Sequence, residues 1–174
     1  AVVHIIYDDP LRAAEAARKL AEAAEQSGHW LPVYWGRGFQ AWAEARAGHS
    51  EAAEATMAQS QAIAQEVGGR LLFEDWFLVA RADIALAARR IPEALDRAKQ
   101  AVATAQEIDN PAVEGGGLLV WGQALAALEP PCWDEAEARF AEALRIVESV
   151  PSPPQAAHTH LVWGTVCRDR GDLT

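Results

Sequence analysis

A spacing of small and large residues recurs along the chain at nearly constant intervals. Ala53, Met57 and Ser60 place a large residue four positions after a small one, and a second small residue three positions later. The same spacing begins again 41 residues later at Ala94, and 42 residues after that at Ala136. Repetition with a period of about 20 to 50 residues is typical of chains built by stacking one supersecondary unit. The spacing therefore favours a repeat array over a single irregular core.

The units of this array are predicted to be helical. Apolar residues recur with the period of a helix, and Gly or Pro residues separate the periodic segments. The apolar fraction is 51% with only 7% aromatic residues, and much of it is alanine, which favours helices and lets their axes approach closely. We therefore predict an all-α fold without strands, in which residues 1–7 form either the end of a helix or a free arm. The predicted helices are residues 10–27, 30–47, 50–67, 71–88, 92–108, 112–128, 133–149 and 154–170.

The first helices of the units also correspond to one another. Trp121-Gly122 recurs as Trp163-Gly164 after 42 residues, and Ala41-Trp42 occupies the matching place in an earlier unit. A small residue at this place lets the first helix of a pair press against its partner. Gly48 lies in the tight turn between paired helices, five residues before the repeated alanine. Trp35-Gly36 has similar residues but falls outside this register.

A small residue, a turn glycine and then A-x-x-x-F-x-x-A resembles the tetratricopeptide repeat (TPR). The segments from Leu118 to Val147 and from Gln155 to Asp172 carry the resemblance best. The period near 42 is similar to the longer variant in bacterial signalling proteins, where such an array follows an ATPase, a cyclase or a transcription-activator module. The resemblance implies a right-handed α-solenoid of antiparallel helix pairs, with about four repeats and a concave groove lined by the first helix of each pair.

The chain departs from this pattern at several positions. A weaker copy of the repeat has Arg18 in place of the usual aromatic residue, and Ala98 replaces it in another copy. Arg89 replaces the turn glycine, and Pro130-Pro131-Cys132 lengthens one loop. We nevertheless expect one repeat domain over residues 1–174, cut from a longer array whose exposed ends could pair as a dimer. Its units are expected near residues 1–28, 29–69, 70–110, 111–152 and, as a half unit, 153–174.

The groove implied by the resemblance contains several tryptophans. Trp35, Trp42 and Trp76 are predicted to converge on its N-terminal half, where a large ring with one N–H donor could anchor a partner. The i, i+7 spacing of Trp35 and Trp42 also suits packing between repeats, so a core role for the rings stays open. The predicted partner-binding residues are Trp35, Trp42, Arg46, Trp76, Val79, Asp83, Gln123, His158 and Arg168.

Two functions fit such a groove. The first is a non-catalytic scaffold that binds a peptide or a partner domain, including another domain of the same polypeptide, as a regulatory part of a larger signalling protein. The alternative is a sensor in which a small effector binds the groove and controls an attached ATPase, cyclase or transcription activator. A concave, largely apolar pocket with a few convergent polar groups would indicate the sensor.

Charge, hydropathy and cysteine content argue against other classes of function. The formal net charge is −10 and no segment concentrates Lys and Arg, so neither nucleic acid nor a membrane surface is an expected partner. No apolar run approaches the roughly 20 residues that span a bilayer. Cys132 and Cys167 lack metal-ligand spacing and are interpreted as free thiols. These features indicate a cytoplasmic, bacterial protein.

Catalytic motifs are not apparent in the sequence. His158 and His160 lie two positions apart on a predicted helix, which points them about 200° apart and prevents a shared metal site. Gly115-Gly116-Gly117 lacks the following Lys-Ser or Lys-Thr of a phosphate-binding loop and is better explained by close helix crossing or a bend. We therefore expect no enzyme activity, no cofactor and no metal.

Overall fold

The structure is a computed structural model that describes residues 6–68, 71–150 and 152–171. Throughout these residues the regular secondary structure is helical and no strand occurs, which confirms the predicted all-α fold. Residues 6–8 are also helical, whereas the rest of the predicted N-terminal helix or arm lies outside the described residues. The long helices are α2 (Pro10–Gln26), α3 (Trp30–Arg46), α4 (Ser50–Val67), α5 (Glu74–Ala87), α6 (Ile91–Glu107), α7 (Pro111–Ala126), α8 (Trp133–Ser149) and α9 (Pro153–Arg170).

Local sequence signals explain most helix starts. Proline occupies the first turn of α2, α6, α7 and α9, where the missing N–H has no helical partner to lose. The side chain of Asp9 caps α2 by accepting from the N–H of Arg12 at 3.1 Å. The start of α5 is the largest departure from prediction, because Phe73 has a left-handed backbone (φ 70°) and the helix begins only at Glu74.

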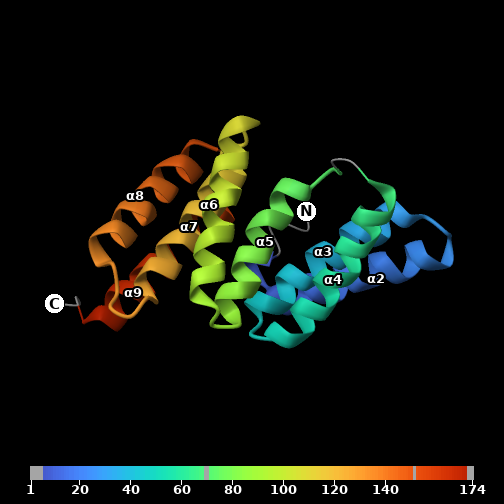
Figure 1. The fold of residues 1–174 in the computed structure, drawn as a ribbon, viewed down its shortest axis with the longest axis horizontal. Coiled ribbons are helices and arrows are strands. Elements are labelled where there is room, and N and C mark those ends of the chain that lie inside the picture. Colours follow the sequence, from blue (N-terminus) through green and yellow to red (C-terminus); the bar gives the residue numbers. More distant parts are fainter. Residues whose placement is uncertain (1–5, 69–70, 151, 172–174) are drawn as a thin grey trace.

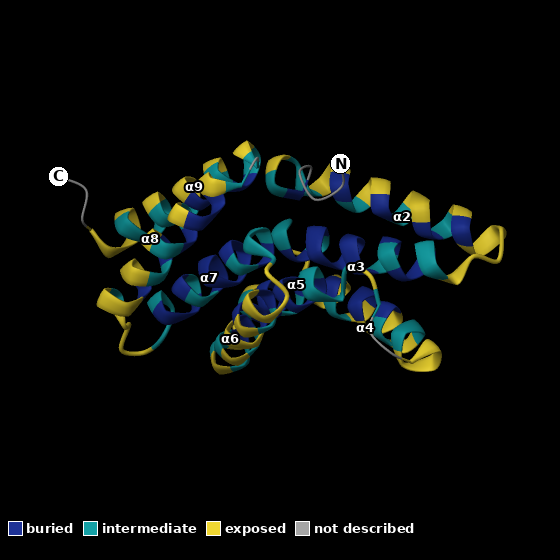
Figure 2. Ribbon diagram, turned by 90° about the horizontal axis from the view of Figure 1, so that it is seen from above, coloured by how far each residue is buried: buried dark blue, intermediate teal, exposed yellow. Residues whose placement is uncertain are grey.

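Consecutive helices pack against each other in chain order (Figure 1). In addition, α3, α5, α7 and α9 contact one another successively and so form an inner row. Figure 2 shows α3, α5 and α7 as a middle layer, with α4 and α6 on one side and α2 and α9 on the other. This arrangement is that of a helical repeat, in which each unit supplies one helix to the inner row.

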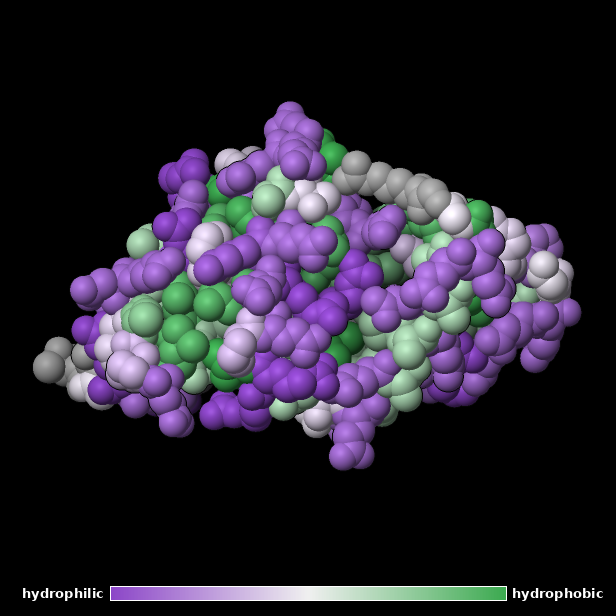
Figure 3. Space-filling model, viewed as in Figure 1, coloured by the Kyte–Doolittle hydropathy of each residue, from purple (hydrophilic) through white to green (hydrophobic). Residues whose placement is uncertain are grey.

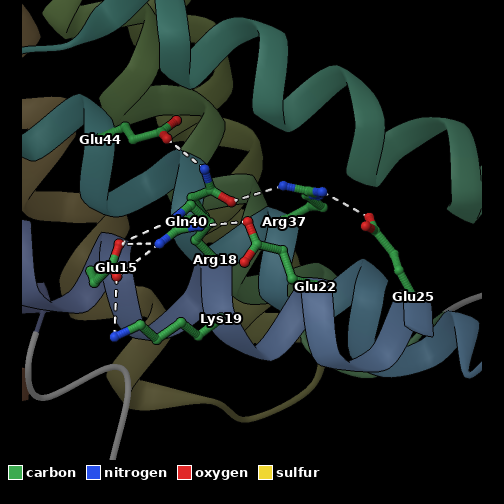
Figure 4. A network of polar contacts seen from close by, with 8 residues as sticks. All are labelled: Glu15, Arg18, Lys19, Glu22, Glu25, Arg37, Gln40 and Glu44. Carbon is green, nitrogen blue, oxygen red and sulfur yellow. Dashed lines mark hydrogen bonds and ion pairs between the residues drawn. The ribbon is translucent and has the colours of Figure 1, made fainter. Parts of the chain in front are cut away.

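The repeated sequence positions are equivalent in the structure. In the three strongest copies of the repeat, both small residues and the residue between them are buried. Arg18, in the weaker copy, instead lies on the surface of α2 and pairs with Glu15 and Glu22, as Figure 4 shows. Arg37 of α3 joins the two helices by an ion pair of 2.7 Å to Glu25. The buried repeat positions are Ala53, Met57, Ser60, Ala94, Ala98, Ala101, Ala136, Phe140 and Ala143.

Small residues bring the helix axes together, most clearly on α7. Gly115, Gly116 and Gly117 face a different helix each: Val147 of α8, Val79 of α5 and Val102 of α6. A Cβ at Gly117 would lie 2.9 Å from the Val102 side chain, closer than packed carbon atoms allow. Of the two predicted explanations, a crossing or a bend, close helix crossing is therefore the one observed at Gly115 and Gly117.

None of the helices in residues 6–68, 71–150 and 152–171 combines the length and apolarity that crossing a membrane requires.

The glycine that fell outside the repeat register also has a packing role, and it provides a stability test. A Cβ at Gly36 would lie 2.8 Å from the backbone nitrogen of Ala21 and 2.9 Å from the carbonyl oxygen of Ala17. Because backbone atoms cannot move aside cheaply, Gly36→Ala should lower the free energy of unfolding by about 1–3 kcal/mol, measured by urea denaturation.

Gly164→Ala is the matched control, since a Cβ there meets nothing within 4 Å. Alanine is the better helix former, so this change should raise the free energy of unfolding by up to about 1 kcal/mol. Equal effects of the two substitutions would contradict the close approach of α2 and α3.

Candidate binding groove

Four of the nine predicted binding residues line one cavity. Arg46 of α3, Asp83 of α5, Gln123 of α7 and His158 of α9 surround a space of about 320 Å³, which we call the inner chamber. Each residue comes from a different helix of the inner row. The chamber is completed mainly by apolar side chains and by one tyrosine, including Ile6, Tyr7, Leu86 and Val162.

A second cavity of about 370 Å³ adjoins the inner chamber, and we call it the outer chamber. Leu86 and Gln123 line both cavities, so the two lie side by side. The outer chamber is further lined by Trp133 at the start of α8 and by Val166 and Asp169 of α9. We call the two neighbouring chambers together the groove, and α5, α7 and α9 contribute residues to both.

A buried ion pair forms the wall of the inner chamber. Arg46 Nη2 lies 2.8 Å from Asp83 Oδ2, and the two side chains are only 10% and 9% exposed. The same carboxylate oxygen accepts from Arg46 Nε at 3.0 Å and from the indole Nε1 of Trp42 at 2.6 Å. Three donors on one oxygen compensate the carboxylate for the water it has lost.

Arg46 also contacts the N-terminal segment and α9. Its guanidinium lies 4.7 Å from the ring centroid of Tyr7, and Nη1 donates to Nε2 of His158. Since a guanidinium can only donate, Nε2 must accept and the imidazole is neutral, with its proton on Nδ1. Burial and then the charge of Arg46 lower the pKa of His158 from 6.5 to about 4.

Tyr7 packs over this site with an unsatisfied hydroxyl. Its ring centroid lies 5.2 Å from that of His158 and 5.9 Å from that of Trp42. The hydroxyl is buried and has no hydrogen-bond partner among the described residues. Burial raises the pKa of Tyr7 to about 12, so the hydroxyl remains a donor at neutral pH.

Gln123 lies where the two chambers meet. Within the described part of the chain, its side-chain amide makes no hydrogen bond, although the residue is partly buried. The amide therefore has a donor and an acceptor free at the junction of the chambers.

The predicted tryptophan anchors have a different environment from the one expected. Trp42 is fully buried, because its ring packs between α3 and α5 and its N–H is bound to Asp83, so it cannot act as an exposed anchor. Trp76 is partly buried with its ring 6.1 Å from Trp42, and Trp35 packs edge-on against Phe73. The structure therefore favours the core role that the i, i+7 spacing had left open.

Two further predicted residues lie away from the cavities. Val79 is 1% exposed and belongs to the core. Arg168 is exposed, pairs with Asp169, and lines neither chamber.

Sequence reasoning missed Tyr7 and Trp133 as groove residues. Tyr7 lies in a short segment whose structure the sequence left open, and it meets His158 only because the chain returns 151 positions later. Trp133 begins α8, directly after the lengthened loop, and that loop was the available signal.

Within residues 6–68, 71–150 and 152–171, no group of three or more His, Cys, Asp or Glu side chains is placed to hold a metal ion. The sequence matches no known family model, and neither a curated protein nor a solved structure matches it.

The neutral imidazole makes a pH-dependent contribution to stability. Above pH 6.5 His158 is neutral both folded and unfolded, but as the pH falls from 6.5 toward 4 only the unfolded chain takes up the proton. The free energy of unfolding should therefore fall over this range, and His158→Gln should remove that part of the decrease, measured by urea denaturation at a series of pH values.

His160→Gln is the control, because His160 is 59% exposed on the same helix. This variant should retain the decrease seen in the parent chain. If both variants follow the parent chain, His158 is not held neutral in the folded protein.

Proposed function

We propose that this chain is a non-catalytic binding module that holds an extended segment of a partner protein in the groove formed by the two chambers. The observation that carries the proposal is that the two chambers lie side by side and share Leu86 and Gln123 in their walls. A linear ligand suits two adjoining cavities, because successive side chains can enter one and then the other.

The lining of the groove indicates the chemistry of that segment. The charges of Arg46 and Asp83 are paired and His158 is neutral, so the inner chamber has no free charge to offer. Apolar side chains such as Leu86 and Val162 favour an apolar residue of the partner. The free amide of Gln123 suits a peptide group, which also has one donor and one acceptor. We therefore expect an uncharged, largely apolar residue of the motif in the inner chamber, whereas Arg89 and Asp169 give the outer chamber a polar lining.

The resemblance to the tetratricopeptide repeat suggests the kind of protein to which this module belongs. We propose a right-handed tetratricopeptide-like solenoid of about four repeats that acts as a regulatory part of a larger signalling protein in the bacterial cytoplasm. Helices packed in chain order and an inner row of first helices support the solenoid. Cys132 and Cys167 are free thiols, as a reducing compartment allows.

A small effector in the inner chamber is the second candidate. Polar groups of Arg46, Asp83, Gln123 and His158 converge there, and the nearby Tyr7 hydroxyl lacks a partner. A volume of about 320 Å³ is at the lower end of the range for small-molecule sites. A compound that raises the melting temperature of the parent chain but not of Gln123→Met would support this reading.

The peptide proposal is tested by selecting linear peptides from a displayed library against the purified chain. Ala87 is an exposed residue that lines the inner chamber, so Ala87→Trp should fill the chamber without entering the core. We expect selected peptides to bind Ala87→Trp at least about tenfold more weakly, a difference of about 1.4 kcal/mol. Gln123→Met, which keeps the side-chain length but removes the amide, should also weaken binding.

The control is Ala55→Trp, which adds the same ring at an exposed position of α4 outside both chambers. It should bind the peptides like the parent chain, with unchanged helicity by circular dichroism. Peptides that bind Ala87→Trp as tightly as Ala55→Trp would show that the groove is not the binding surface. A library that yields no binder would count against the proposal as well.

A further inference from the structure

A third cavity lies on the opposite side of α5 from the groove. Asp83 faces the inner chamber, whereas Arg81, two positions earlier and thus about 200° around the helix, lines a cleft of about 150 Å³. This cleft lies between α4, α5 and α6, and its apolar lining is Met57 and Ile84, each 4% exposed. Figure 3 shows strongly hydrophilic side chains on the part of the surface that lies over α5 and α6.

The charges around this cleft are unevenly matched. Three arginines line it with only two carboxylates. Arg90 lies 2.7 Å from Glu54 and 2.7 Å from Glu93, and Arg97 lies 2.7 Å from Glu93. Both carboxylates are therefore engaged by Arg90 and Arg97, so the lining carries one positive charge in excess. Glu74, outside the lining, also acts on the charge of Arg81.

Arg81 carries the unmatched charge. Its guanidinium forms no hydrogen bond or ion pair with any residue that the structure describes, although the side chain is only partly exposed. Burial and then the nearby charge of Arg97 lower the pKa of Arg81 from its usual value. The guanidinium remains charged, and its five donors are partly screened from water and open to a group that enters the cleft.

We propose that the cleft binds a single small oxyanion, a carboxylate or a phosphate group, with Arg81 as its main donor. The planar fork of a guanidinium matches two oxygens of either group. Gln61 also lines the cleft and can donate from its amide. A volume of about 150 Å³ admits one such group but not a nucleotide or a peptide, so the site takes a free ion or the end of one side chain. This site is separate from the groove and does not depend on the function proposed for it.

The site is tested by titrating the whole chain with inorganic phosphate, with acetate and with chloride at equal ionic strength. The arginine Nε–H signals are followed by nuclear magnetic resonance. We expect phosphate or acetate to move the Arg81 signal in a saturable way, while chloride does not. A response to phosphate alone indicates a phosphate site, and an equal response to acetate indicates a carboxylate site.

Arg81→Gln should abolish the saturable response of the remaining cleft signals, those of Arg90 and Arg97. Arg145→Gln, which removes an exposed arginine of α8, is the control and should leave the response unchanged. The proposal is overturned if neither oxyanion exceeds chloride in the parent chain. It is also overturned if Arg81→Gln still saturates like Arg145→Gln.

Discussion

The ion pair between Arg46 and Asp83 is the interaction on which the groove depends. Moving two charges out of water is costly, and such a pair is tolerated only where further hydrogen bonds satisfy it. Here Asp83 also accepts from Trp42, while Arg46 reaches the ring of Tyr7 and the imidazole of His158. One pair therefore connects α3 and α5 with the N-terminal segment and with α9. The helices of the inner row are held in a fixed relation by polar contacts as well as by packing.

Small residues make this polar cluster geometrically feasible. Alanine and glycine at the repeat positions and on α7 allow the helices to approach until short side chains interlock. The space that glycine leaves is filled by large rings, with Phe77 beside Gly38 and Phe140 beside Gly122. Helix α5 carries two contrasting sites. The inner chamber has its charges paired, whereas the cleft side keeps one arginine without an acceptor.

The fold was largely predictable from the sequence because the small residues that allow the helices to pack recur at regular intervals. The alanine spacing that begins at Ala53, Ala94 and Ala136 marks buried positions in three units, and glycine and proline mark the helix ends. The local sequence pattern could not decide whether Trp42 is buried or exposed, since the i, i+7 spacing of Trp35 and Trp42 suits both the core and a groove. Its burial depends on Asp83, 41 residues away, which offers an acceptor to the indole. The roles of Tyr7 and Gly36 likewise arise only from contacts between helices.

The most direct test of this account is a double-mutant cycle on Arg46 and Asp83, measured by urea denaturation. Arg46→Met and Asp83→Leu should each lower the free energy of unfolding by about 3 kcal/mol or more, because each leaves one buried charge without its partner. Arg46→Met/Asp83→Leu should cost much less than the sum, with a coupling energy of about 2 kcal/mol or more. Effects that add to within about 0.5 kcal/mol would contradict the account, since the two side chains would then not interact in the folded protein.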